Sequence, residues 1–456
     1  MGNTKDILLG RIRSAETLSL GQQLKLSLLL SYPAILAQLS SVMMQYIDTS
    51  MVGHLGPAAG ASIGLVSTCL WLMGGFGMAA TSGFSVQVAH HIGGNDFRGA
   101  RDILRQALVS ILGFSAAIAL VGVAVCGQLP HWLGGGEDIA ADATRYFLIM
   151  SLFMPAMLLD WTCAAMLQAS GNMKVPSILS IGMCLMDVAF NYLFIYVLGM
   201  GVVGAAIGSG LAELLTGVLM FGFLAFRSPE LRLTQERGSY RPTEPVIRKA
   251  LDIGGPMALQ NLLMRGGYIA ATVIVAPLGT ISIAANSFAI TAESLCYMPG
   301  AGIADAATTL VGQSVGARRK DLARRFAWIT TFLAMGTMGV LAVLMYLFAP
   351  QMMGLLSPDA AVIGLGARVL RIEAFAELGY AASMVAYGAC VGAGDTKWPS
   401  IMNLTSMWVV RIVPAIFLTR IYGLVGFWIC MAVELSFRGA IFLVHLQRGK
   451  WLKQLP

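Results

Sequence analysis

The sequence predicts an all-α integral membrane protein with twelve transmembrane helices, arranged as two six-helix lobes that repeat each other in parallel. The composition is the first reason, because 57% of the residues are hydrophobic and only 12% are charged, whereas a soluble domain carries about 25% charged residues. Windows of about 20 residues almost free of charge recur along the chain, and each is long enough to cross a bilayer as a helix. The short alternating strands of a membrane barrel are not seen.

An internal repeat is the second reason. Residues 88–101 (VAHHIGGNDFRGAR) return as residues 311–324 (VGQSVGARRKDLAR), a shift of 223 positions (324 − 101 = 223). The same shift places ASGNMKVPS (169–177) on GAGDTKWPS (392–400). The chain is therefore one unit written twice. An even number of spans in each copy makes both copies enter the membrane from the same side, as in parallel repeats.

Each expected span is a charge-poor stretch between polar or Gly/Pro-containing connections. In chain order the spans are 26–52, 60–89, 104–127, 143–167, 175–198, 202–226, 250–276, 281–311, 326–348, 362–391, 400–420 and 425–446. The longest connection contains three prolines and six basic residues, counting Arg248, and marks the boundary between the lobes. The predicted parts are a cytoplasmic amino-terminal tail (1–25), an amino-terminal lobe with helices 1–6 (26–226), a cytoplasmic linker (227–249), a carboxyl-terminal lobe with helices 7–12 (250–446) and a cytoplasmic tail (447–456).

The distribution of Lys and Arg predicts the orientation. These residues cluster in the amino terminus, the even-numbered connections and the carboxyl terminus, whereas the odd-numbered connections carry essentially one, Arg420. By the positive-inside rule both termini face the cytoplasm, with the protein in the plasma membrane, the inner membrane of a bacterium. The net charge of +7 then reflects topology, and we expect no nucleic-acid partner. The first dozen residues are expected to be a solvated tail.

Polar residues in the first span lie on one helical face. Gln38, Ser41, Gln45 and Asp48 advance by three, four and three positions. A carboxylate at the centre of a membrane helix costs about 2.5 to 3.5 kcal/mol, so it is usually retained for an ion or proton pathway. The alternative is a structural hydrogen bond to a neighbouring helix.

The fifth span offers partners for that carboxylate. Asp187 and Asn191 lie one helical turn apart, and carboxylate and amide oxygens are the ligands that hard cations prefer. We therefore predict a cation-coupling group of Asp48, Asp187, Asn191 and Gln45. Asp187 has an alternative role as a simple partner of another helix.

The second copy places its polar residues elsewhere. Asp48 maps onto Ala271 and has no twin. Candidate residues of a substrate cleft are found instead in spans seven, eight and ten: Asn261, Glu293, Tyr297, Glu377 and Tyr380, with Glu373 on the face of Glu377. The abundant Met and aromatic residues suit bulky cationic ligands, although helix packing is the ordinary reason for any one of them.

These features together resemble the multidrug and toxic compound extrusion (MATE) family. The resemblance rests on DTSMVGHLG (48–56), on the doubled inner motifs and on the paired ASGNMKVPS and GAGDTKWPS stretches, and it covers about 26–446. It implies a secondary exporter of small organic cations that is driven by exchange for Na⁺ or H⁺. It also implies an amino-lobe cation pocket, onto which Asp48, Asp187 and Asn191 map, although the family often has the Asn before the Asp. Glu293 resembles an acid that another branch carries in span eight, as a substrate-cation or second proton site.

Other functions are expected less. A lipid or lipid-linked-sugar flippase would have a more cationic cleft, and Arg265 and Arg411 leave that alternative open. A channel would need a filter-like loop, and an enzyme would need a motif such as HExxH or GxSxG; neither is seen. We expect a monomer in the lipid bilayer that is not an enzyme and has no cofactor. The sequence defines no certain metal site, and Asp48 and Asp187 are the residues that could coordinate Na⁺.

Overall fold

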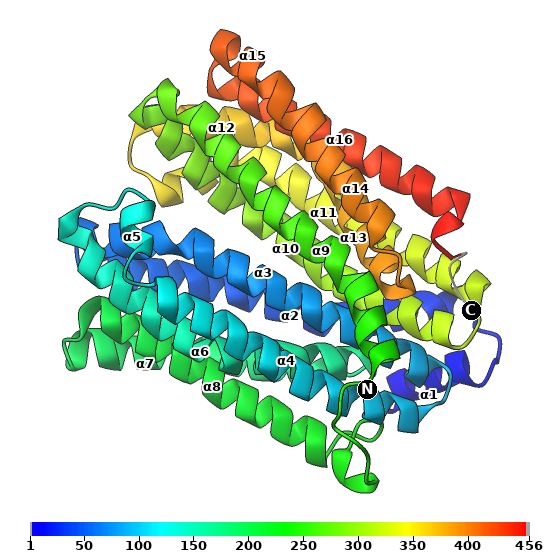
Figure 1. Cartoon of the computed structure of the whole chain (residues 1–456). Coiled ribbons are helices and arrows are strands. Elements are labelled where there is room, and N and C mark those ends of the chain that lie inside the picture. Colours follow the sequence, from blue (N-terminus) through cyan, green and yellow to red (C-terminus); the bar gives the residue numbers. More distant parts are fainter. Residues whose placement is uncertain (1, 453–456) are drawn as a thin grey trace. The chain divides into compact units, whose positions relative to one another are not determined.

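The computed structural model describes residues 2–452, and the residues that it describes form helices and connecting turns with no strand (Figure 1). The α-helices are α1 (Gly2–Arg13), α2 (Leu20–Gly53), α3 (Pro57–Gly93), α4 (Phe97–Val125), α5 (Leu129–Trp132), α6 (Glu137–Ala169), α7 (Lys174–Asn191), α8 (Gly201–Phe226), α9 (Glu244–Val275), α10 (Thr280–Gly316), α11 (Lys320–Leu356), α12 (Ala360–Ala374), α13 (Glu377–Ala393), α14 (Lys397–Thr405), α15 (Val413–Tyr422) and α16 (Leu424–Arg448). Two π-helices, η1 (Tyr192–Val197) and η4 (Ser406–Ile412), and three 3₁₀-helices, η2 (Leu233–Gln235), η3 (Ala276–Leu278) and η5 (Lys450–Leu452), complete the chain. The predicted all-α fold is confirmed.

The backbone repeats with the shift that the sequence predicts. Helices α3 and α10 both begin and end 223 positions apart, and α4 and α11 begin 223 positions apart. The glycines before α3 and α10, Gly56 and Gly279, share a positive φ of 116° and 98°, a conformation that only glycine adopts without strain. The turns therefore repeat as well as the helices.

Most of the helices are long and apolar enough to span a bilayer. Ten continuous helical stretches in the described part of the chain pass that test, with α14, η4 and α15 counted as one stretch, and α12 with α13 make an eleventh if this pair, bent by 57°, is one span. Helix α10 is long enough, with 37 residues, but it buries several polar side chains, among them Glu293, Gln313 and Ser314. The protein is a multi-pass membrane protein, and the predicted twelve spans would include this more polar helix.

Helix packing divides the chain into two compact units that differ from the predicted lobes. One unit, which we call the amino-terminal unit, comprises Ser40–Ala258, and the carboxyl-terminal unit comprises the residues up to Leu39 and those from Leu259 onward. The first half of α2 belongs to the carboxyl-terminal unit because α10 packs closely on it: a Cβ added at Gly302 would lie 2.6 Å from the Ile35 nitrogen. The lobe boundaries drawn from the repeat describe sequence copies, and as functional lobes they stay a prediction.

Each unit is built on close helix contacts. In the amino-terminal unit α6 packs against α3, α4 and α8, and in the carboxyl-terminal unit α10 packs against α11 and α13, as Figure 1 shows for the helices within each unit. Small residues allow these approaches. Two features differ from the sequence prediction. Helix α1 is not a solvated tail, because its Leu8, Leu9 and Ile12 are buried. The span expected at 362–391 is broken between α12 and α13.

Candidate functional site

Asn191 connects two carboxylates in the amino-terminal unit. Its Nδ2 donates to Asp48 Oδ1 at 3.0 Å and to Asp187 Oδ2 at 3.2 Å, and it lies 3.4 Å from the hydroxyl oxygen of Ser209 on α8. Asp187 and Asn191 are buried, and Asp48 is half-buried. Asn191 is the last residue of α7, directly before the π-helix η1, a helix type often found at functional sites. The structure thus brings together three of the four predicted coupling residues.

This arrangement favours a cation or a proton. The carboxylates of Asp48 and Asp187 share the single Nδ2 atom of Asn191 as a hydrogen-bond donor, and two negative charges so close together repel unless a proton or a cation neutralises one of them. Asn191 Oδ1 is buried and has no hydrogen-bond partner in the described part of the chain. The group therefore offers carboxylate and amide oxygens, the donor set of a hard cation.

The fourth predicted residue, Gln45, lies outside this hydrogen-bond group. Its side chain is exposed, and its backbone carbonyl accepts a hydrogen bond from the Thr49 hydroxyl at 2.8 Å. Gln45 lies three positions before Asp48 on α2, as the sequence pattern predicts. A role for Gln45 in coupling stays a prediction.

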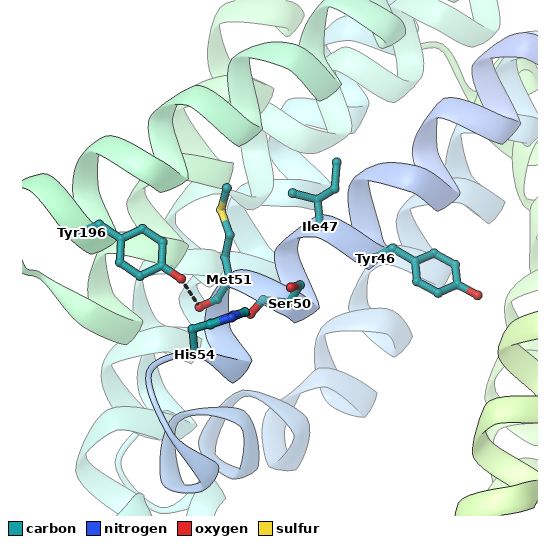
Figure 2. A pocket seen from close by; sticks show the side chains of 6 residues that line it. All are labelled: Tyr46, Ile47, Ser50, Met51, His54 and Tyr196. Carbon is teal, nitrogen blue, oxygen red and sulfur yellow. Dashed lines mark hydrogen bonds between the residues drawn. The ribbon is translucent and has the colours of Figure 1, made fainter. Parts of the chain in front are cut away.

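An open pocket of about 420 Å³ lies beside the Asp48 segment of α2 (Figure 2). Its lining is mostly aromatic and apolar: Tyr46, Ile47, Ser50, Met51, His54 and Tyr196. The hydroxyl of Tyr196, from η1, donates to the Met51 carbonyl at 2.6 Å, as the dashed line in Figure 2 shows. Because Ile47 and Asp48 are consecutive, the pocket and the carboxylate group share one turn of α2.

A second acidic group lies in the carboxyl-terminal unit. Glu293 of α10, Glu373 of α12 and Glu377 of α13 are buried, with one carboxylate oxygen of each within 4.8 Å of the others. Both oxygens of Glu373 lack a hydrogen-bond partner among the described residues, and the thiol of Cys296 lies next to Glu377. A buried carboxylate without a donor is costly, so this group also requires protons or a cation.

Two aromatic residues accompany the second acidic group. The rings of Tyr297 and Tyr380 lie 5.5 Å apart and are tilted by 52°. Tyr297 comes four positions after Glu293, and Tyr380 comes three positions after Glu377. The structure thus brings together four of the five predicted cleft residues. The fifth, Asn261, is half-buried on α9, and its assignment to the cleft stays a prediction.

Sequence reasoning did not find a buried ion network in the same unit. Glu434 of α16 accepts from Arg411 Nε at 3.0 Å and from Arg438 Nε at 2.7 Å, and the Ser406 hydroxyl donates to it. The one sequence feature that indicates this network is the spacing of Glu434 and Arg438, which are four positions apart and so lie on one face of a helix. Similarly, Asp305 faces Gln38 at 3.4 Å, so the polar stripe of the first span has partners in both units.

The fold and these sites define a class of protein: a multi-pass helical membrane protein of two parallel repeats with acidic groups inside its spans, which is the architecture of a secondary transporter. The sequence profile of the MatE family matches residues 33–193 and 256–417, one match in each copy of the repeat. The chain belongs to this family, the multidrug and toxic compound extrusion proteins.

Individual relatives agree with this assignment. The chain is 25% identical over 439 residues to the probable multidrug resistance protein NorM of Thermotoga maritima, covering 93% of this chain and 92% of the relative. It is 26% identical over 445 residues to the protein of the same name from Bacillus cereus, with 94% and 97% covered. Among solved structures, an outward-facing multidrug resistance MATE family transporter matches with a TM-score of 0.89 at 21% identity, over 96% of this chain and all of that one. That likeness shows the fold.

Proposed function

We propose that the protein is a secondary active antiporter that exports small organic cations in exchange for H⁺ or Na⁺, by alternating access of its two lobes. The observation that carries the proposal is the amide of Asn191 between the carboxylates of Asp48 and Asp187, inside the membrane spans. Intramembrane carboxylates of this kind are retained for ion or proton pathways. The NorM relatives, which are named for multidrug resistance, support a drug-like substrate.

Coupling follows from differential binding. A proton or Na⁺ at Asp48 and Asp187 removes the repulsion between them, and it shifts the equilibrium toward whichever lobe arrangement binds that ion more tightly. Organic cations bind the other arrangement more tightly, so the outward movement of one is linked to the inward movement of the other. Neither step needs a bound cofactor.

The substrate is proposed to contact two parts of the protein. The pocket of Tyr46, Met51 and Tyr196 offers aromatic and thioether surface for a hydrophobic cation (Figure 2). Glu293 and Glu377, with Tyr297 and Tyr380 beside them, are proposed to neutralise the charge of the substrate or to bind a second proton. We further propose that the protein acts as a monomer in the bacterial inner membrane with both termini in the cytoplasm.

The test is efflux of a fluorescent organic cation from cells that express wild-type protein, Asp48→Asn or Asp160→Asn. Asp160 is the matched control because it is also buried in the amino-terminal unit but is not part of the Asn191 hydrogen-bond group. The pH and Na⁺ gradients are collapsed in turn. We expect wild-type efflux to depend on one gradient, Asp48→Asn to lose it and Asp160→Asn to keep it. Efflux that survives in Asp48→Asn would remove this carboxylate from the coupling mechanism.

A flippase is the alternative, and the charges of the carboxyl-terminal unit weigh against it. Arg411 forms a salt bridge with Glu434, and the guanidinium of Arg265 lies 5.9 Å from the ring centroid of Tyr268. The arginines that would attract a lipid phosphate therefore have partners within the protein. Absence of wild-type efflux under every gradient, together with lipid scrambling in reconstituted vesicles, would favour the flippase.

A further inference from the structure

A basic hollow of about 520 Å³ lies where the turn between α10 and α11 meets the segment that joins α1 to α2. Its lining includes four cationic side chains and one carboxylate: Arg318, Arg319, Lys320, Arg325 and Asp321. Arg318, Lys320 and Arg325 form no salt bridge within the described part of the chain. The hollow thus carries an excess of positive charge that the protein does not neutralise.

Helix α1 is bound to Arg319, one of the residues that line this hollow. Arg319 Nη1 donates to the backbone carbonyl oxygens of Arg11 at 3.1 Å and of Ile12 at 3.4 Å, at the carboxyl end of α1. A cation is favourable there because the last carbonyls of a helix are otherwise unsatisfied. The apolar side chains Leu8, Leu9 and Ile12 of α1 are buried, so packing as well as Arg319 holds this helix beside the hollow. The hollow is a built pocket rather than a row of charges on a loop.

An apolar groove continues from the basic hollow along α11. A second hollow of about 500 Å³ shares Asp321 and Arg325 with the first and is otherwise lined by Leu20, Arg324, Trp328, Ile329 and Phe332. The rings of Trp328 and Phe332 stack at 5.4 Å, and Phe332 is 59% exposed. Helix α11 is long and apolar enough to span a membrane, and this aromatic strip extends about 10 Å from Arg325 along the helix.

The first copy of the repeat provides an internal comparison. The residues equivalent to Arg318, Arg319 and Lys320 are Asn95, Asp96 and Phe97. Asn95 and Arg318 have the same left-handed backbone, with φ of 60° and 59°, which Asn tolerates more readily than Arg. The turn before α4 therefore carries an amide, an acid and an aromatic ring, whereas the equivalent turn before α11 carries three cations. Topological charge bias alone does not explain why the cations gather around one hollow.

We propose that this site binds an anionic phospholipid, with its phosphate among Arg318, Lys320 and Arg325 and one acyl chain along Trp328 and Phe332. Basic pockets at the membrane surface between helices suit such headgroups, and the adjoining aromatic strip suits a chain but not a soluble anion. The occupied site would connect α1 to α11. The inference is independent of the transported substrate and of the coupling ion.

The experiment uses the full chain, purified in detergent, with phosphatidylglycerol, phosphatidylcholine or inorganic phosphate as probe. Bound lipid is counted by native mass spectrometry, and protection is measured by thermal unfolding. The test variant is the double substitution Arg318→Asn with Arg325→Gln; the first change installs the residue of the other repeat and suits the backbone. The control is Arg241→Gln, an exposed basic residue in the segment before α9. Trp328→Ala tests the groove.

We expect wild-type protein to retain phosphatidylglycerol in preference to phosphatidylcholine. The double variant should lose roughly 25-fold in affinity, about fivefold for each charge removed, and the control should lose less than twofold. Trp328→Ala should weaken the binding of a long-chain lipid more than the binding of a short-chain analogue. Equal retention of the two lipids, or an equal loss in the control, would overturn the site. Protection by inorganic phosphate that matches the lipid would show a soluble-anion pocket and overturn the lipid assignment.

Discussion

The position of the Asn191 amide can be tested from the neighbouring helix. A Cβ added at Gly208 of α8 would lie 3.0 Å from the Asn191 backbone nitrogen and 3.1 Å from its Cγ, so Gly208→Ala forces the amide away from the two carboxylates. A hydrogen bond to a charged group contributes about 1.5 to 3 kcal/mol. Loss of one of the two hydrogen bonds should therefore lower the apparent affinity of the protein for the coupling ion by roughly 10- to 150-fold.

Two other glycines of α8 provide matched controls. A Cβ at Gly210 would meet the ring of Phe153, whereas a Cβ at Gly222 would meet no atom within 4 Å. Gly210→Ala therefore reproduces the overpacking, which costs about 1 to 3 kcal/mol, without moving Asn191. Gly222→Ala adds only the helix preference of alanine, about 0.5 to 1 kcal/mol in favour of folding.

The assay is the dependence of organic-cation efflux on ion concentration in proteoliposomes, with thermal unfolding measured on the same preparations. We expect Gly208→Ala to shift the ion dependence, Gly210→Ala to lower only the unfolding temperature, and Gly222→Ala to change neither adversely. If Gly208→Ala keeps the wild-type ion dependence, the bridging amide is not needed for coupling. If Gly210→Ala shifts the ion dependence of efflux as much as Gly208→Ala does, the shift is caused by overpacking of α8 and not by movement of the Asn191 amide.

Three further predictions concern single carboxylates. Glu434→Gln leaves two buried guanidinium groups without their counter-charge, so we expect a loss of about 3 to 5 kcal/mol in thermal unfolding; an unchanged transition would contradict a structural role. Glu373→Gln removes like-charge repulsion, so it should raise the unfolding temperature at pH 8, unlike the exposed control Glu137→Gln. Asp96 accepts from the Gly99 backbone N–H at 2.9 Å and caps α4, and this bond, helped by His91, holds its pKa below the ordinary 3.8. Because the folded pKa is depressed, the stabilisation is present above pH 3.8 and is lost as the pH falls through the folded value; Asp96→Ala should cost about 0.5 to 1 kcal/mol near pH 7 and nothing at strongly acid pH.

The sequence predicted the repeat and the α-helical spans, since each depends on a pattern along the chain. The grouping of Asp48 with Asn191 was predicted from the chemistry of cation ligands and from the family resemblance. The 223-residue shift anticipated the paired helix starts of α3 and α10. The break between α12 and α13 had no such signal, because neither Phe375 nor Ala376 is a helix breaker. The network around Glu434 could not be predicted either. Its partner Arg411 lies in a π-helix, and the periodicity of an α-helix does not show which way a side chain points there.

The two copies keep one backbone but divide the acidic groups between them. Asp48 has Ala271 at the equivalent position, and Glu293 and Glu377 have Leu70 and Met154. A duplicated backbone preserves helix packing, which depends on small residues and turn glycines at matching positions. A buried carboxylate contributes nothing to that packing and is costly wherever no proton or cation reaches it. Each acidic group is therefore expected to persist only in the copy where it serves transport, which is why the paired sites differ while the paired turns remain superimposable in their backbone angles.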